Sequence, residues 1–272
     1  MISSIEARVG VYVDAANISR NGGFGMRYDV LRRYACRGGG QSVRLNVYVG
    51  FDADRAERDN VYQTKTRSWE NAVRDFGFKV IEKTVKWYVD ETGNRVAKAN
   101  ADLDMAVDAL LQSEKLDQVI FLTGDGDFVQ VVRALQNKGL RVEVVAFDNV
   151  SNDLRREADW YLSGYLIPDL LPCSEEDAPL WGEPGSRVRG MCVNWQASYG
   201  FLRVLGSISP NLWITDHRKP NSPYLSVFVH ESDFEKGVRF NALPNRHMVF
   251  EFDLEKAEKG FVGKKIKLVS QG

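Results

Sequence analysis

Cysteine is scarce in this chain of 272 residues, and the three that occur, Cys36, Cys173 and Cys192, are far apart in the sequence. Such spacing fits neither a disulfide framework nor a zinc site, and the odd number suits the reducing cytosol. Long apolar runs are also lacking. No stretch of 18 apolar residues predicts a transmembrane helix, and the first residues lack the apolar core of a signal peptide. We therefore expect a cytoplasmic protein with no membrane partner.

Histidine is equally rare and occurs only in the last third of the sequence, at His217, His230 and His247. This distribution excludes histidine-based catalysis in the first domain. The net charge is only −1, yet residues 187–272 carry 13 Lys and Arg against 8 Asp and Glu, a net charge of +5. The basic C-terminal part therefore permits contacts with nucleic-acid phosphates.

Strand and helix patterns alternate over the first 170 residues. Apolar runs predict strands at 9–13, 43–49, 119–122 and 141–147, and helical periods predict helices near 26–36, 55–75, 98–111 and 128–138. In the helix near 98–111 the predicted apolar stripe consists of Leu103, Ala106, Val107, Leu110 and Leu111. The alternation predicts an α/β fold with a parallel sheet flanked by helices.

Two acids follow the strand at 119–122, because Asp125 and Asp127 lie in the turn before the next helix. In a βαβ unit this turn lies at the carboxyl edge of the sheet, where such folds bind ligands. Two acids one residue apart need a cation or hydrogen-bond donors between them if both are to ionise. A helix N-cap accounts for one of them but not for both.

Further acids lie where the topology would bring them to the same edge. Asp14 follows the first strand, with Asn17 within reach, and Asp102 stands at a helix start, where it either caps the helix or joins the other acids. Parallel strands end at a common edge, so we expect these acids to meet Asp125 and Asp127. Clustered carboxylates are hard oxygen ligands that suit Mg²⁺ or Mn²⁺ rather than zinc.

Three more polar residues lie beside these acids in the sequence. Asp104 and Asp108 share one side of the same helix and are either reserve metal ligands or part of a solvated face. Lys98 either meets a phosphate or a surplus negative charge, or is a surface lysine. Residues 78–89, with a turn at 91–94, predict a hairpin arm over the site.

The pattern changes beyond residues 172–186, which are rich in proline, glycine and acids and predict a linker between domains at 1–171 and 187–272. Short β-type runs at 188–193, 199–205, 224–230, 248–254 and 265–269 predict a small all-β barrel.

Tyr199 alternates with Phe201, and Phe228 with His230, so each pair shares one face of its strand. On an outer face such residues stack on bases, at about 1–3 kcal/mol per base. On an inner face they form the core, and the pattern leaves both open.

Four motifs in the first domain resemble the NYN domain of PIN-like nucleases, in particular its LabA-like bacterial branch. They are Val-Asp14-Ala-Ala-Asn17-Ile, the segment from Lys98 to Asp108, Thr-Gly-Asp125-Gly-Asp127-Phe, and the segment from Ser151 to Asp159. The resemblance implies a Rossmann-like parallel sheet of PIN type, a carboxylate cluster that binds Mg²⁺ or Mn²⁺, and hydrolysis of RNA phosphodiesters. The sequence departs from the family at Asn100-Ala101, where Gly-Val usually precedes the acid.

The C-terminal runs resemble a cold-shock domain, a five-stranded barrel of OB type. Tyr199-Gly-Phe201-Leu lies at its first RNA-binding signature, Val227-Phe228-Val-His230 at its second, and Trp195 at the aromatic residue before the first. Departures are Ala197-Ser198 in place of a basic residue and Glu231 in place of an aromatic one. Residues 206–223 form an insertion between the second and third strands.

Together these features predict a metal-dependent ribonuclease that captures single-stranded RNA with its barrel. The expected metal ligands and catalytic acids are Asp14, Asp102, Asp125 and Asp127. Asn17 would orient the substrate or a metal-bound water, and Lys98 would contact phosphate or hold a carboxylate. One alternative is an RNA-binding regulator with an inactive site. Another is a phosphatase, although Ala16 replaces the second acid of its Asp-x-Asp motif. The sequence leaves homo-oligomerisation open.

Overall fold

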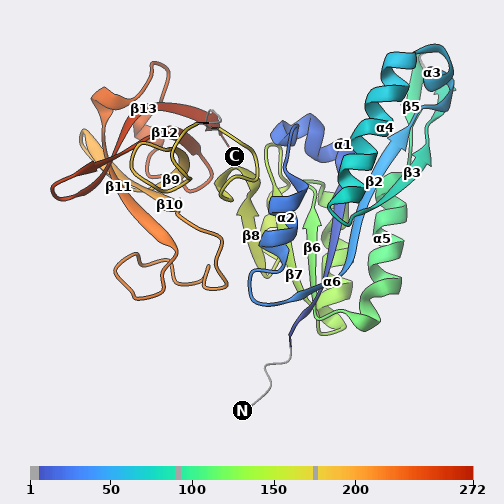
Figure 1. The fold of residues 1–272 in the computed structure, drawn as a ribbon, viewed down its shortest axis with the longest axis horizontal. Coiled ribbons are helices and arrows are strands. Elements are labelled where there is room, and N and C mark those ends of the chain that lie inside the picture. The colour runs from blue at the N-terminus through green and yellow to red at the C-terminus, as the bar shows by residue number, and fades with distance from the viewer. Residues whose placement is uncertain (1–5, 90–92, 174–176, 272) are drawn as a thin grey trace. The chain divides into compact units, whose positions relative to one another are not determined.

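The computed structural model describes residues 6–89, 93–173 and 177–271, apart from the side chains of residues 89 and 95–98 (Figure 1). The chain divides into two compact units that interleave along the sequence. One comprises Met1–Gly22, Gly39–Ala146 and Val150–Tyr161, and the other comprises Gly23–Gly38, Phe147–Asn149 and Leu162–Gly272. The domain boundaries at 171 and 187 stay a prediction. Within the described part of the chain, every helix is too short or too polar to cross a membrane.

A six-stranded sheet has the strand order β3-β2-β1-β6-β7-β8. Its strands are β1 (Arg8–Asp14), β2 (Gln41–Phe51), β3 (Lys79–Thr84), β6 (Gln118–Leu122), β7 (Arg141–Ala146) and β8 (Trp160–Ser163). Every pairing from β3 to β7 is parallel. The central strands β1 and β6 are almost entirely buried, as expected when helices cover both faces of a sheet. The predicted α/β fold with a parallel sheet is confirmed.

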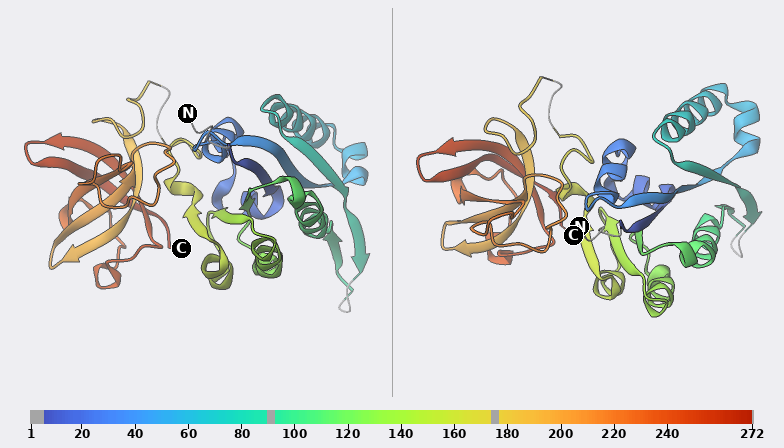
Figure 2. Two further views of the ribbon diagram at one scale, coloured as in Figure 1. Left: turned by 90° about the horizontal axis from the view of Figure 1, so that it is seen from below. Right: turned by 60° about the horizontal axis from the view of Figure 1, so that its bottom comes forward.

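Seven α-helices accompany the described strands of this sheet: α1 (Ala15–Ile18), α2 (Tyr28–Ala35), α3 (Ala53–Arg58), α4 (Asn60–Asp75), α5 (Ala101–Gln112), α6 (Val129–Asn137) and α7 (Asn152–Glu157). Helix α4 lies on one face of the sheet, and α5 and α6 lie on the other (Figure 2). The single helix predicted near 55–75 is two helices. They separate at Asp59, whose backbone is extended and whose carboxylate accepts the N–H of Tyr62 at 2.9 Å, so a new helix begins.

Helix α5 bears out the predicted apolar stripe only in part, because Ala106 and Leu110 pack against the core and the other three residues do not. Met105 and Ala109 are fully buried, whereas Leu103, Val107 and Leu111 are 58%, 46% and 72% exposed. The buried side of α5 also carries polar groups. Tyr48 donates its hydroxyl hydrogen to Asp108 at 2.7 Å, and Tyr12 donates to Gln112 at 3.2 Å. Polar residues of the helix are thus turned toward tyrosines of the sheet, and this rotates Leu103, Val107 and Leu111 outward.

A separate two-stranded sheet precedes α5. Strands β4 (Lys86–Val89) and β5 (Arg95–Lys98) pair in antiparallel fashion, as predicted for a hairpin arm. In the predicted turn at 91–94, residues 91 and 92 lie outside the described residues. Lys98 belongs to β5 and not to the helix, which begins at Ala101.

The C-terminal part forms a closed barrel with the strand order β10-β11-β13-β12-β9. Its strands are β9 (Arg187–Gln196), β10 (Tyr199–Leu205), β11 (Tyr224–His230), β12 (Val249–Ala257) and β13 (Gly260–Ser270). Strands β11 and β13 run parallel, and the other pairs are antiparallel. Leu202, Val204, Val227 and Val229 point into the core with Phe250 and Phe252, so alternate residues of β10 and β11 face outward. The small all-β barrel and the insertion at 206–223 are confirmed.

A buried carboxylate joins neighbouring strands of the barrel. The Glu251 side chain is 5% exposed and is paired with Arg187 at 2.8 Å, Arg189 at 2.9 Å and Lys267 at 2.9 Å. Burial alone would raise the pKa of Glu251, but the hydrogen bonds from Lys267 and Arg187 and the charge of Arg189 lower it overall. The charge of Glu251 therefore stabilises the folded barrel.

Candidate functional site

The turn after β6 is held by its own side chains. The Thr123 hydroxyl accepts the N–H of Asp125 at 3.2 Å, and the Asp125 carboxylate accepts the N–H of Asp127 at 3.0 Å. Asp125 is therefore the N-cap of the short 3₁₀-helix Gly126–Phe128, which leads into α6. Gly126 has no room for a side chain, because a Cβ there would lie 2.9 Å from the Ser151 hydroxyl oxygen. The turn places Asp125 and Asp127 at the carboxyl edge of β6.

Asn17 ties this turn to the end of β1. Its backbone N–H donates to the Asp14 carboxylate at 2.9 Å, and its side-chain oxygen accepts the N–H of Gly124 at 2.9 Å. The Gly124 carbonyl in turn accepts the N–H of Ser151 at 2.9 Å. Three loops at one edge of the sheet are thus joined by hydrogen bonds. The oxygen of Asn17 is used by the fold, and its expected role toward substrate or metal-bound water stays a prediction.

Two acids from other elements act on the buried Asp14 at this edge. Asp14 is 9% exposed. Its pKa is raised chiefly by burial and further by the negative charges of Asp102 and Asp125, although the backbone N–H of Asn17 opposes the shift. Asp102 is exposed on the first turn of α5, and Asp127 is exposed beside Asp125. The charges of Asp102 and Asp125 thus act on Asp14, and the expected cluster of all four acids stays a prediction.

The donor chemistry at this edge suits a hard divalent cation, because the acidic side chains there offer carboxylate oxygens. The acids are not gathered into a ready coordination shell. Across the described residues, no group of three or more Asp, Glu, His or Cys side chains is arranged to hold a metal ion. Binding of a cation by Asp14, Asp102 and Asp125 would therefore require their side chains to draw together.

The two reserve acids have protein partners. Lys83 of β3 donates to both oxygens of Asp104, at 2.9 and 2.7 Å. Asp108 accepts the hydroxyl of Tyr48, and burial together with this hydrogen bond raises the pKa of Tyr48. Both contacts join α5 to the sheet, so the structure gives Asp104 and Asp108 structural roles in addition to any chemical one.

A basic and aromatic surface next to these acids escaped the sequence reasoning. Lys83, Lys86 and Tyr88 line a pocket of about 510 Å³ together with Asn100 and Leu103, which flank the start of α5. The interleaved Lys83-Thr-Val-Lys86-Trp-Tyr88 pattern was the available signal. The backbone of Lys98 pairs with that of Lys86, and the Lys98 side chain lies outside the described part of the structure. Its expected phosphate contact stays a prediction.

On the barrel, the alternating aromatic residues point outward. Tyr199 and Phe201 of β10 are each 36% exposed. Phe228 of β11 lies between them, with its ring centroid 5.8 Å from that of Tyr199 in a stacked arrangement and 5.8 Å from that of Phe201 in an edge-on one. The three rings form a continuous ladder across two strands, which is the arrangement a base-stacking surface requires.

Trp195 and His230 flank this ladder with partners of their own. Trp195 is half-buried, stacks on Phe240 at 5.2 Å and meets the ring of Phe234 edge-on at 5.7 Å. His230 accepts the backbone N–H of Ser232 at Nδ1, at 3.2 Å. The same nitrogen lies 2.8 Å from the Ser232 hydroxyl oxygen. Trp195 thus packs against the aromatic residues of the barrel and keeps part of its ring exposed. The expected roles of Trp195 and His230 in RNA binding stay predictions.

Comparison with known proteins identifies the family of the first domain. The NYN domain profile matches residues 8–167. The low amplitude and bright protein LabA of Synechococcus elongatus is 26% identical over 185 residues, which cover 65% of this chain and 95% of that protein. A crystal structure of a protein of unknown function from Vibrio parahaemolyticus superposes with a TM-score of 0.48 at 23% identity, over 60% of this chain and 96% of that one.

Proposed function

Because the chain belongs to the NYN domain family, a family of PIN-like nucleases, we propose that it is a ribonuclease dependent on Mg²⁺ or Mn²⁺. The observation that carries the proposal is the buried Asp14, which faces the charges of Asp102 and Asp125 at the carboxyl edge of the sheet. Among the described side chains Asp14 has no basic partner. A carboxylate in that position is costly for the fold alone and becomes favourable beside a cation.

In this proposal Asp14, Asp102, Asp125 and Asp127 hold the metal, with Asp104 and Asp108 as reserve ligands. A bound divalent cation would activate water and polarise the phosphodiester. Other residues of the chain position these acids and the RNA. Asn17 and Thr123 fix the turn that carries Asp125, and Lys86 offers positive charge to the RNA backbone, whereas the charge of Lys83 is paired with Asp104. Lys98 is proposed to contact phosphate or to hold a carboxylate.

We assign the barrel to the OB type and propose that it captures single-stranded RNA in the manner of a cold-shock domain. Counted along the chain its strands close in the order 1-2-3-5-4, with strands 3 and 5 parallel. The proposed stacking residues are Tyr199, Phe201 and Phe228, flanked by Trp195 and His230. Stacking on such rings is worth about 1–3 kcal/mol per base and tolerates any sequence.

A second candidate is an RNA-binding regulator without turnover. It is favoured by the arrangement of the acids, which act on one another electrostatically but form no ready metal shell in the part of the chain described. The two candidates share the RNA-binding barrel and differ in whether the acids perform hydrolysis.

The decisive experiment is cleavage of end-labelled single-stranded RNA with Mg²⁺ or Mn²⁺ by the wild type and by Asp125→Asn. Asparagine keeps the oxygen that accepts the N–H of Asp127, so the turn survives while the charge is lost. Asp54→Asn, an exposed acid in α3, is the matched control. Metal-dependent cleavage by the wild type and by Asp54→Asn, but not by Asp125→Asn, is the expected result.

Tight RNA binding without cleavage by the wild type would favour the regulator. Equal cleavage by wild type and Asp125→Asn would mean that the activity belongs to a contaminant. Hydrolysis of a generic phosphomonoester, with no cleavage of RNA, would contradict the ribonuclease and favour a phosphatase.

A further inference from the structure

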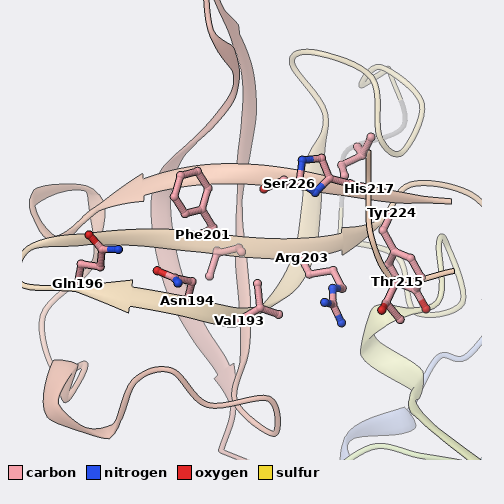
Figure 3. A pocket seen from close by; sticks show the side chains of 11 residues that line it. Val193, Asn194, Gln196, Phe201, Arg203, Thr215, His217, Tyr224 and Ser226 are labelled. Atoms are coloured by element: carbon pink, nitrogen blue, oxygen red, sulfur yellow. The ribbon is translucent and has the colours of Figure 1, made fainter. Parts of the chain in front are cut away.

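The insertion between β10 and β11 encloses one end of the outer face of the barrel. Residues of β9, β10 and β11, together with Thr215 and His217 of the insertion, line a pocket of about 430 Å³. Figure 3 shows the side chains along these strands, with Phe201 and Gln196 toward one end and Arg203 and Tyr224 toward the other. The base-stacking ladder is open to solvent, but beyond Phe201 it leads into this walled space.

Hydrogen bonds hold the insertion that forms the wall of the pocket. The Tyr224 hydroxyl donates to the Leu212 carbonyl at 2.9 Å, and the Ser222 hydroxyl donates to the Ile214 carbonyl at 2.8 Å. Leu212 is 3% exposed and anchors the insertion by its side chain. Asp216, the acid nearest to His217 in sequence, is occupied by Arg218 at 2.9 Å. The insertion is therefore tied to the start of β11 in a defined conformation.

The pocket contains a positive charge with nothing to neutralise it. The side chain of Arg203 makes no hydrogen bond or ion pair with any described residue, and its guanidinium carbon lies 5.7 Å from the ring centroid of Tyr224. Burial and the nearby charge of Arg246 lower the pKa of Arg203. None of the described lining residues is acidic. An unpaired, half-buried guanidinium next to a second arginine is a site for an anion, and phosphate matches its geometry.

The other end of the pocket suits a planar, hydrogen-bonding group. Phe201 presents a ring that is 36% exposed, and it lies directly opposite Asn194 on β9 and Phe228 on β11. Asn194 and Gln196 are exposed beside it and carry both donors and acceptors, which match the edge of a base. Along the strands Gln196 comes first, Phe201 and Asn194 lie side by side next, and Arg203 follows at the other end (Figure 3).

We infer that this pocket is a nucleotide subsite, in which the phosphate of a single-stranded RNA binds at Arg203 while the attached base packs on Phe201. The inference rests on the proposed RNA capture by the barrel and extends it. The ladder accepts bases in succession, and the insertion adds a position, walled on one side, where one nucleotide is held by both its base and its phosphate.

The test is a fluorescence-anisotropy titration of the full chain with labelled oligouridylate at several salt concentrations. We expect Arg203→Gln to weaken binding about tenfold and to reduce the slope of log affinity against log salt by roughly 0.7, the loss of one phosphate contact to a single strand. Arg203→Lys keeps the charge and should restore the slope. Lys259→Gln removes an equal charge from the exposed β12–β13 turn and should leave affinity nearly unchanged.

Phe228→Ala distinguishes the nucleotide subsite from RNA capture by the ladder, because Phe228 belongs to the ladder and does not line the pocket. If Phe228→Ala weakens binding while Arg203→Gln matches Lys259→Gln in affinity and slope, the subsite is refuted and capture by the ladder stands. If the wild type does not bind the oligonucleotide, RNA capture by the barrel itself is refuted. Circular dichroism of each variant identifies any that fails to fold, and Arg203→Lys then still tests the charge.

Discussion

Asn17→Ala tests whether the turn that carries the acids is held by a single side-chain hydrogen bond. The substitution removes the oxygen that accepts the Gly124 N–H at 2.9 Å and keeps the backbone N–H of residue 17, which donates to the Asp14 carboxylate. Gly124 is buried, and without the Asn17 oxygen its N–H has no hydrogen-bond acceptor. An unsatisfied buried donor costs about 1–3 kcal/mol, and the partial exposure of Asn17 favours the lower half of that range. We therefore expect a melting temperature lower by roughly 2–8 °C.

Cleavage should fall by more than the loss of stability explains. A shift of the turn moves Asp125 away from Asp14, and a misplacement of 1 Å can cost a catalyst about a hundredfold in rate. Thermal melts and RNA cleavage of Asn17→Ala would be compared with those of Asn137→Ala, an exposed asparagine at the end of α6. If Asn17→Ala melts like the wild type but fails to cleave, Asn17 acts on the substrate or on a metal-bound water, and the positioning role argued from the structure is wrong.

Two further substitutions probe buried carboxylates by urea unfolding. Glu251→Gln should lower the free energy of unfolding by about 3 kcal/mol at pH 7, since it breaks a buried ion pair, and Glu255→Gln on the same strand should change it little. The pKa of Glu251 is lowered on folding, so this stabilisation is present above the ordinary value of 4.5 and is lost as the pH falls through the folded value. Asp14→Asn should instead raise the free energy of unfolding at pH 7. Its raised pKa makes ionised Asp14 costly as the pH rises above 3.8, so the variant should be more stable than the wild type at pH 7 while losing cleavage. Equal stability of either variant and the wild type would contradict the corresponding argument.

The parts of the fold that could be predicted from the sequence are those fixed by local pattern. Asp14 and Asp125 follow short apolar runs, and a parallel sheet brings the ends of its central strands together whatever the details of the connections. The alternation of Tyr199 and Phe201 likewise predicts that both lie on one face of a strand. It does not predict which face, because that depends on how the barrel closes.

The parts that could not be predicted depend on contacts between distant residues. The rotation of α5 follows from the hydrogen bond between Tyr48 and Asp108, 60 positions apart, and a helical count of apolar residues cannot detect it. The pairing of Lys83 with Asp104 is of the same kind. The insertion at 206–223 was visible as a gap between strand patterns, but the pocket beneath it arises only when Tyr224 anchors that segment over β10.

Asp14 differs from the other buried acids of the chain in a way that bears on function. Glu251 is paired with two arginines and a lysine, Glu70 lies 2.7 Å from Arg67, and Glu143 lies 2.9 Å from Arg141. Each of these charges is neutralised within the fold. Asp14 instead faces two further acids and receives only backbone N–H groups among the described residues. A sequence under selection for stability alone would place asparagine there, since asparagine can accept the same N–H of Asn17. An unpaired buried charge of this kind is expected where a residue serves chemistry rather than folding, and this supports the proposed role of Asp14 at the ends of β1 and β6.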